Sequence, residues 1–144
     1  MNLTETHIET LRESWALAEP KSAALITRFY EILFERAPEK AAMFAGTDMD
    51  AQGRKLGAAV AFVIAEAGRP GRLLPALYDL GRRHAGYGVE PEDYDAVGGA
   101  LISALSETLG DAFATRTRDA WAAAYETVSC AMIAGGMPRA ERSA

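Results

Sequence analysis

The fold class of this chain is decided by residues 73–85, which read Leu-Leu-Pro-Ala-Leu-Tyr-Asp-Leu-Gly-Arg-Arg-His-Ala. Within this stretch Leu74, Leu77, Leu80 and His84 recur at steps of three and four residues. That spacing puts them on one face of an α-helix, because a helix completes a turn in about 3.6 residues. The stretch therefore predicts a helix whose apolar face ends in a histidine, just before the helix-breaking glycines at 86 and 88.

The same spacing recurs on both sides of this stretch. It predicts helices over residues 5–19, 25–35, 51–67, 91–110 and 115–133, and a short helix that begins at Pro38. Thr4 is the expected N-cap of the first of them. Runs that alternate apolar and polar residues are absent, and the helix-breaking residues are too frequent for one long coiled coil. We therefore expect an all-α domain of crossing helices over residues 1–136, followed by a polar tail over 137–144.

Composition excludes several classes of function. The 15 lysines and arginines against 20 aspartates and glutamates give a net charge of −5, which argues against nucleic acid or an anionic membrane as a partner. The N-terminus lacks a signal peptide, and the longest apolar run, 56–65, is too short to cross a bilayer. A cytoplasmic location is therefore expected.

Soft metal ligands are scarce in this chain. It has two histidines, His7 and His84, and one cysteine, Cys130, which is too few for a four-ligand zinc site or an internal disulfide. His7 is expected to be exposed and Cys130 to be a small apolar filler. His84 has two interpretations: a core histidine that hydrogen-bonds a carbonyl, or the axial ligand of a haem iron, which needs only one protein ligand.

The sequence resembles a globin over about residues 3–133, most closely the single-domain bacterial globins related to flavohaemoglobin haem domains, with a neuroglobin-like stretch. Each matching segment is weak alone, but their order and spacing are specific to the family. The segments are 29–34 (Phe-Tyr-Glu-Ile-Leu-Phe), 38–44 (Pro-Glu-Lys-Ala-Ala-Met-Phe), 52–56 (Gln-Gly-Arg-Lys-Leu), 80–84 (Leu-Gly-Arg-Arg-His), 94–98 (Tyr-Asp-Ala-Val-Gly) and 121–125 (Trp-Ala-Ala-Ala-Tyr).

The resemblance implies a three-over-three helical sandwich around a b-type haem. His84 would be the proximal iron ligand, and Phe44 would stack on the haem. Tyr30, Gln52 and Leu56 would form the distal side, where a phenol and an amide can donate hydrogen bonds to dioxygen. Two of these residues also have a structural interpretation: Tyr30 as a core aromatic and Gln52 as a solvated side chain at a helix start.

The resemblance implies further haem contacts as well. Lys55 and Arg83 would be propionate partners, although each can equally be a solvated charge. Gly53 would allow two helices to cross closely. The remaining wall of the pocket would be formed by Leu80, Val89, Tyr94, Val97 and Tyr125.

One position departs from the flavohaemoglobin pattern. There, a tyrosine and a glutamate support the proximal histidine. Tyr94 fits the first position, but the second falls on Gly136. The relay that would push electron density through the imidazole is therefore incomplete.

Three functions follow from the resemblance. The first is a haem protein that reversibly binds dioxygen and other diatomic ligands, such as nitric oxide and carbon monoxide. The second is an enzyme for nitric oxide dioxygenation, or for nitrite or peroxide detoxification. Its electrons would come from a separate reductase, since no flavin or nicotinamide domain is expected in this chain. The third is a sensor module, with or without haem.

Overall fold

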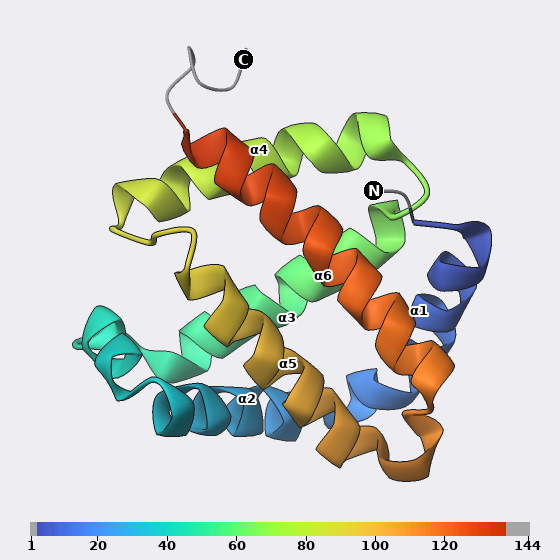
Figure 1. The fold of residues 1–144 in the computed structure, drawn as a ribbon. Coiled ribbons are helices and arrows are strands. Elements are labelled where there is room, and N and C mark those ends of the chain that lie inside the picture. The colour runs from blue at the N-terminus through green and yellow to red at the C-terminus, as the bar shows by residue number, and fades with distance from the viewer. Residues whose placement is uncertain (1–2, 138–144) are drawn as a thin grey trace.

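The computed structural model describes residues 3–137, which form helices and contain no strand. The all-α prediction is therefore confirmed for this part of the chain. The long helices are α1 (Glu5–Ala18), α2 (Ser22–Arg36), α3 (Met49–Glu66), α4 (Pro70–Gly86), α5 (Asp93–Leu109) and α6 (Thr115–Gly136), and the short 3-10 segments are η1 (Glu19–Lys21), η2 (Pro38–Phe44) and η3 (Gly110–Ala112) (Figure 1). The predicted tail falls almost wholly on residues 138–144, which lie outside the described range.

Local sequence explains where these helices begin and end. The Thr4 hydroxyl accepts a hydrogen bond from the His7 amide at 3.0 Å, which confirms Thr4 as the cap of α1. Asp48 caps α3 by accepting bonds from the amides of Asp50 and Ala51. Pro70 begins α4 at the position where a missing N–H is no loss. Gly110 ends α5 with a φ of 57°, a conformation that favours glycine.

The interior is divided into two apolar clusters. The larger joins α1, α2, α5 and α6, and its members include Leu11, Phe29, Leu33, Leu105 and Trp121. At its centre the Trp121 indole donates to the Ser14 hydroxyl at 2.8 Å, which satisfies a buried polar group. The smaller cluster lies between α4 and α6 and consists of Leu73, Leu77, Ala131 and Met132. Thus α4, the helix that carries His84, packs chiefly against α6.

Glycines allow α4 and α6 to cross with their backbones in contact (Figure 1). A Cβ atom on Gly81 would lie 1.9 Å from the carbonyl oxygen of Met132, and one on Gly135 would lie 2.1 Å from that of Tyr78. Neither position can hold a larger residue unless the helices move apart. This crossing fixes the axis of α4, and with it the position of the histidine at its end.

The structure corrects two sequence-based expectations. Cys130 is exposed, because Ala131 and Met132 occupy the face of α6 that packs on α4. His7 is half-buried rather than exposed, and its Nδ1 accepts a hydrogen bond from the Thr4 amide, which completes a reciprocal cap. Within residues 3–137, no helix combines the length and the apolar composition needed to cross a bilayer.

Candidate functional site

His84 lies in the last turn of α4, where it is half-buried. Its Nδ1 atom is 2.9 Å from the carbonyl oxygen of Leu80, one turn earlier. A carbonyl can only accept, so Nδ1 carries a proton, and in the neutral imidazole Nε2 then keeps its lone pair. The ring is therefore held in the tautomer that a metal ligand requires.

An aromatic cluster forms on α2 and η2. The ring centroid of Tyr30 lies 4.8 Å from that of Phe29, 5.5 Å from that of Phe44 and 5.9 Å from that of Phe34. The contacts with Phe29 and Phe44 are edge-to-face, a favoured arrangement of aromatic rings. The sequence predictions Tyr30 and Phe44 are thus brought together, although 13 residues separate them.

Gln52 joins this cluster from the first turn of α3. It is half-buried, and its side chain lies near enough to the Tyr30 phenol to influence the pKa of that group. Burial raises the pKa of Tyr30, and the neighbouring Gln52 side chain offsets part of that rise. The phenol therefore stays protonated at neutral pH and can act as a hydrogen-bond donor.

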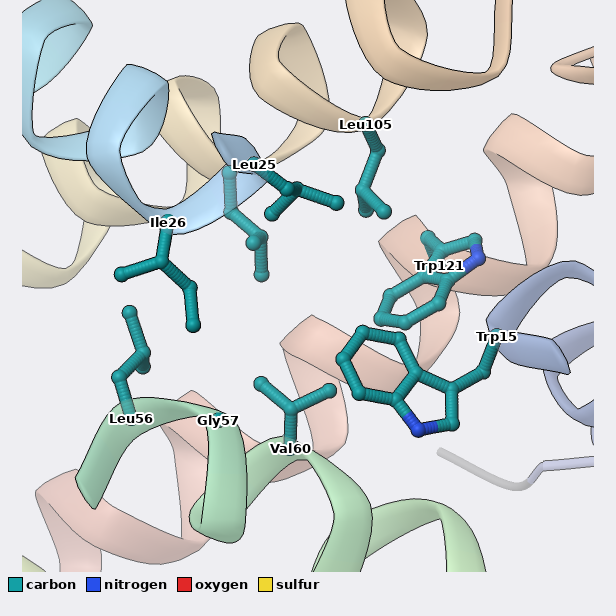
Figure 2. Close-up of a pocket in the computed structure, with 9 residues that line it drawn as sticks. Trp15, Leu25, Ile26, Leu56, Gly57, Val60, Leu105 and Trp121 are labelled. Carbon is teal, nitrogen blue, oxygen red and sulfur yellow. The ribbon is translucent and has the colours of Figure 1, made fainter. Parts of the chain in front are cut away.

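Leu56 follows Gln52 by one turn on α3 and is half-buried. It lines a cavity of about 10 Å³, room for roughly one water-sized molecule. Figure 2 shows its side chain pointing towards Ile26 of α2, with the paired rings of Trp15 and Trp121 at the other end of the cavity. The lining is wholly apolar and consists of Trp15, Leu25, Ile26, Leu56, Gly57, Val60, Leu101, Leu105 and Trp121.

Gly53 has the structural role expected of it. A Cβ atom there would lie 3.1 Å from Cγ2 of Ile26, so α3 passes close to α2 at this point. The approach places Gln52 beside Tyr30.

The two predicted propionate partners are exposed. Lys55 projects from α3, and Arg83 lies on α4, where its Nε is 3.5 Å from a carboxylate oxygen of Asp79. Leu80, Val89 and Val97 are half-buried, and the amide of Val89 donates to the carbonyl oxygen of His84 at 3.1 Å. The loop that follows α4 is thus bonded directly to the histidine.

Tyr94 and Tyr125 are joined by a hydrogen bond between helices. The Tyr125 hydroxyl donates to the carbonyl oxygen of Tyr94 at 2.6 Å, and its ring packs on Gly98, where a Cβ atom would lie 2.6 Å from the ring. Burial raises the pKa of both tyrosines. This arrangement gives Tyr125 a definite role in holding α6 against α5.

The structure explains why glycine occupies position 136. A Cβ atom there would lie 3.0 Å from the Cβ of Ala85 and 3.2 Å from the carbonyl oxygen of Gly81. The α4–α6 crossing therefore leaves little room for a glutamate side chain behind His84.

These residues fit a flat apolar macrocycle with one protein ligand. His84 would supply the ligand through Nε2. Half-buried side chains at the edges of the two clusters are available to contact the macrocycle. They are Phe44, Leu56, Val60 and Val97 on the larger cluster, and Leu80 and Tyr94 on the smaller. Cations of α3 and α4 are exposed to solvent, as the acidic edge of a haem requires. Within residues 3–137, no three His, Cys, Asp or Glu side chains gather to hold a metal ion.

Sequence reasoning missed one pair of residues. Lys40 of η2 and Asp93, the first residue of α5, form an ion pair across 53 positions. Only the run of Asp and Glu around Pro91 hinted that a polar contact would form there, and nothing in the sequence indicated its partner.

Comparisons with known proteins agree with the helical fold. The family model described as Globin matches residues 27–132. A Bacillus subtilis flavohemoprotein is 28% identical over 128 residues, which cover 88% of this chain and 32% of that protein. A Rhizobium meliloti flavohemoprotein is 36% identical over 104 residues, covering 71% of this chain and 26% of that protein. The chain therefore spans about a third of the length of the curated relatives it matches.

Two solved structures share the fold. One is a Pseudomonas aeruginosa protein described as structurally highly homologous to human hemoglobin, with a TM-score of 0.81, 27% identity, and coverage of 92% of this chain and 99% of that chain. The other is an engineered carbene transferase made from a putative nitric oxide dioxygenase of Rhodothermus marinus, with a TM-score of 0.83, 26% identity and coverage of 94% of both chains.

Proposed function

This chain belongs to the globin family, a membership that implies haem binding and small diatomic ligands, and on that premise we propose that it is a b-type haem protein that reversibly binds dioxygen. The observation that carries the proposal is the pairing of Tyr30 with Gln52 in a fold where His84 presents a ligand-ready nitrogen. The chemistry that haem supplies when bound is an iron atom at which diatomic molecules bind.

His84 would hold the cofactor through Nε2. Its bond to Leu80 orients the imidazole. Phe44 supplies an aromatic face, and its contact with Tyr30 fixes the relation between the haem-stacking residue and the distal phenol.

Tyr30 and Gln52 would donate hydrogen bonds to dioxygen. The two side chains are neighbours, and the phenol is protonated at neutral pH because burial raises its pKa. Leu56, one turn beyond Gln52, adds an apolar side chain that limits the access of water. A donor pair in an apolar surrounding stabilises the partial negative charge of bound dioxygen and slows its release.

The test of reversible binding is repeated oxygenation and deoxygenation of the reduced, haem-supplied protein, followed by absorption spectroscopy. The two spectra are expected to interconvert over many cycles. Complete oxidation to the ferric form during the first cycle would contradict the proposal.

A second candidate function is nitric oxide dioxygenation with electrons from a separate reductase. It is supported by the similarity to flavohemoproteins and to the putative nitric oxide dioxygenase of Rhodothermus marinus. Gly136 weighs against efficient turnover, because the family's supporting glutamate is missing. The test is steady-state nitrate formation from nitric oxide and dioxygen, with a flavin reductase and a reduced nicotinamide dinucleotide as the electron source. A single stoichiometric reaction without turnover would reject this candidate.

A further inference from the structure

The ion pair between Lys40 and Asp93 is the most enclosed of the salt bridges found within residues 3–137. Its side chains are 18% and 15% exposed, whereas those of the Arg28–Glu107 pair are 37% and 51% exposed. An enclosed pair is less screened by solvent, so removing one partner alone leaves a poorly hydrated charge. A contact of this kind constrains the two segments that it joins.

Asp93 links the ion pair to the loop that follows His84. The second carboxylate oxygen of Asp93 accepts a hydrogen bond from the amide of Glu90 at 2.8 Å. The loop is bonded to the histidine at its other end, where the amides of Tyr87 and Val89 donate to the carbonyl oxygen of His84 at 3.0 and 3.1 Å. The Asp93 carboxylate thus closes a hydrogen-bonded unit that begins at the proposed iron ligand.

On the other side, the pair reaches the segment that carries Phe44. Lys40 lies in η2, four residues before Phe44, and its amide is bonded to the carbonyl oxygen of Ala37 at 2.9 Å. In Figure 1 the segment after α2 and the loop after α4 lie on the same side of the molecule, at the left of the view, and the ion pair bridges them.

We propose that Lys40 and Asp93 are positioning residues whose ion pair clamps the loop after His84 against η2, so that His84 and Phe44 keep a fixed relation around the haem. This inference rests on the proposed function, since the clamp matters to haem only if the chain binds it. The clamp itself is a property of the protein and can be observed without reference to the cofactor.

The variants Lys40→Met and Asp93→Asn test the clamp. The first keeps the length of the side chain, and the second keeps an oxygen for the Glu90 amide, so each removes mainly the charge. Lys40→Arg keeps the charge and is expected to restore wild-type behaviour. The matched control is Glu107→Gln. It breaks the exposed ion pair with Arg28, which joins α5 to α2 rather than to η2.

Two measurements are made on each purified protein. The first is the rate of haem loss to an excess of a high-affinity haem acceptor, which is expected to rise about tenfold in each charge-removing variant and to stay within about twofold of wild type in the control. In the double variant, the increase in the rate of haem loss is expected to be smaller than the product of the two single-variant increases, because both substitutions remove the same contact. The second is hydrogen exchange at the amides of residues 87–89, which is expected to be faster in both charge-removing variants.

The outcomes distinguish failure of the proposed haem binding from failure of the proposed clamp. Wild-type protein that holds no haem would reject the proposed function, and the exchange rates would still decide whether the clamp exists. Unchanged exchange in both Lys40→Met and Asp93→Asn would overturn the clamp. Faster exchange with unchanged haem loss would overturn its role in holding haem, and so would a Glu107→Gln effect of equal size.

Discussion

The Nδ1 atom of His84 lies 2.9 Å from the carbonyl oxygen of Leu80, one turn earlier on α4. This single bond places a proton on Nδ1, leaves Nε2 as the lone-pair nitrogen of the neutral ring and fixes the ring against its own helix. The position of that helix is set in turn by the glycine crossing with α6. The proposed iron ligand therefore depends on a chain of contacts that can be altered one residue at a time.

Replacing Tyr30 with Phe removes one of the two proposed distal donors and keeps an aromatic ring in the cluster. A net hydrogen bond of about 1 kcal/mol corresponds to roughly a fivefold change, so dioxygen is expected to dissociate at least about five times faster. Stopped-flow mixing of the oxygenated protein with a dioxygen scavenger or carbon monoxide measures this rate. Tyr78→Phe, at an exposed position on α4, is the matched control, and an unchanged rate in Tyr30→Phe would remove Tyr30 from the distal site.

Replacing Gly81 with Ala places a Cβ atom 1.9 Å from the carbonyl oxygen of Met132. The helices must separate to accept it, and overpacking of this kind costs about 1–3 kcal/mol of unfolding free energy. Urea unfolding followed by circular dichroism measures the loss. Gly71→Ala on the same helix has nothing within 4 Å of the new Cβ atom and is expected to be neutral or slightly stabilising. Equal stability of the two variants would show that the crossing is not close-packed.

Introducing the family's glutamate, as Gly136→Glu, tests whether the missing relay can be restored. Because a Cβ atom at this position already meets Ala85 and the backbone of Gly81, the variant is expected to lose unfolding free energy, by about 1–3 kcal/mol. Urea unfolding again gives the measurement. A variant as stable as wild type would mean that the space behind His84 accepts a carboxylate and that glycine is not required there.

Stability is expected to fall at alkaline pH through the buried tyrosines. Burial raises the pKa of Tyr30, Tyr94 and Tyr125 in the folded protein above the ordinary value of 10.0 that applies to the unfolded chain. Above about pH 10 the unfolded state binds fewer protons than the folded state, so the free energy of unfolding decreases as pH rises. Below that pH these groups add no pH dependence.

Urea unfolding at a series of values from pH 8 to about pH 12 measures this decrease, since it begins where unfolded tyrosines ionise. Tyr125→Phe removes one of the three groups and is expected to show a shallower slope, together with a loss of about 1 kcal/mol at neutral pH for the missing bond to Tyr94. Tyr87→Phe, at a position that is 78% exposed, is the control. Identical slopes in Tyr125→Phe and wild type would contradict the assignment.

The spacing of apolar residues predicted the helices well and their ends less well. α4 begins at Pro70 rather than at Leu73, because a proline that reads as a helix breaker also suits the first position of a helix. α6 continues to Gly136, beyond the predicted end at Ile133, because packing on α4 outweighs the low helix propensity of two glycines.

The sequence likewise predicted some features of the candidate site and not others. Tyr30, Phe44 and Gln52 were named from the resemblance, and the structure places them together. The bond from His84 to Leu80 joins residues one helical turn apart, a separation at which local sequence carries information. The Lys40–Asp93 pair and the close fit of Gly136 depend on contacts between distant segments, which the spacing of residues along one helix does not encode.

The absorption spectrum of haem-supplied protein, compared among wild type, His84→Ala and His7→Ala, tests the central claim most directly. Wild type and His7→Ala are expected to show the same intense Soret band and the same five-coordinate spectrum in the reduced state, because His7 belongs to the cap of α1. His84→Ala is expected to lose that spectrum while circular dichroism still shows a helical fold. Wild-type protein that is folded, supplied with haem and colourless would contradict the account, as would a His84→Ala spectrum indistinguishable from wild type.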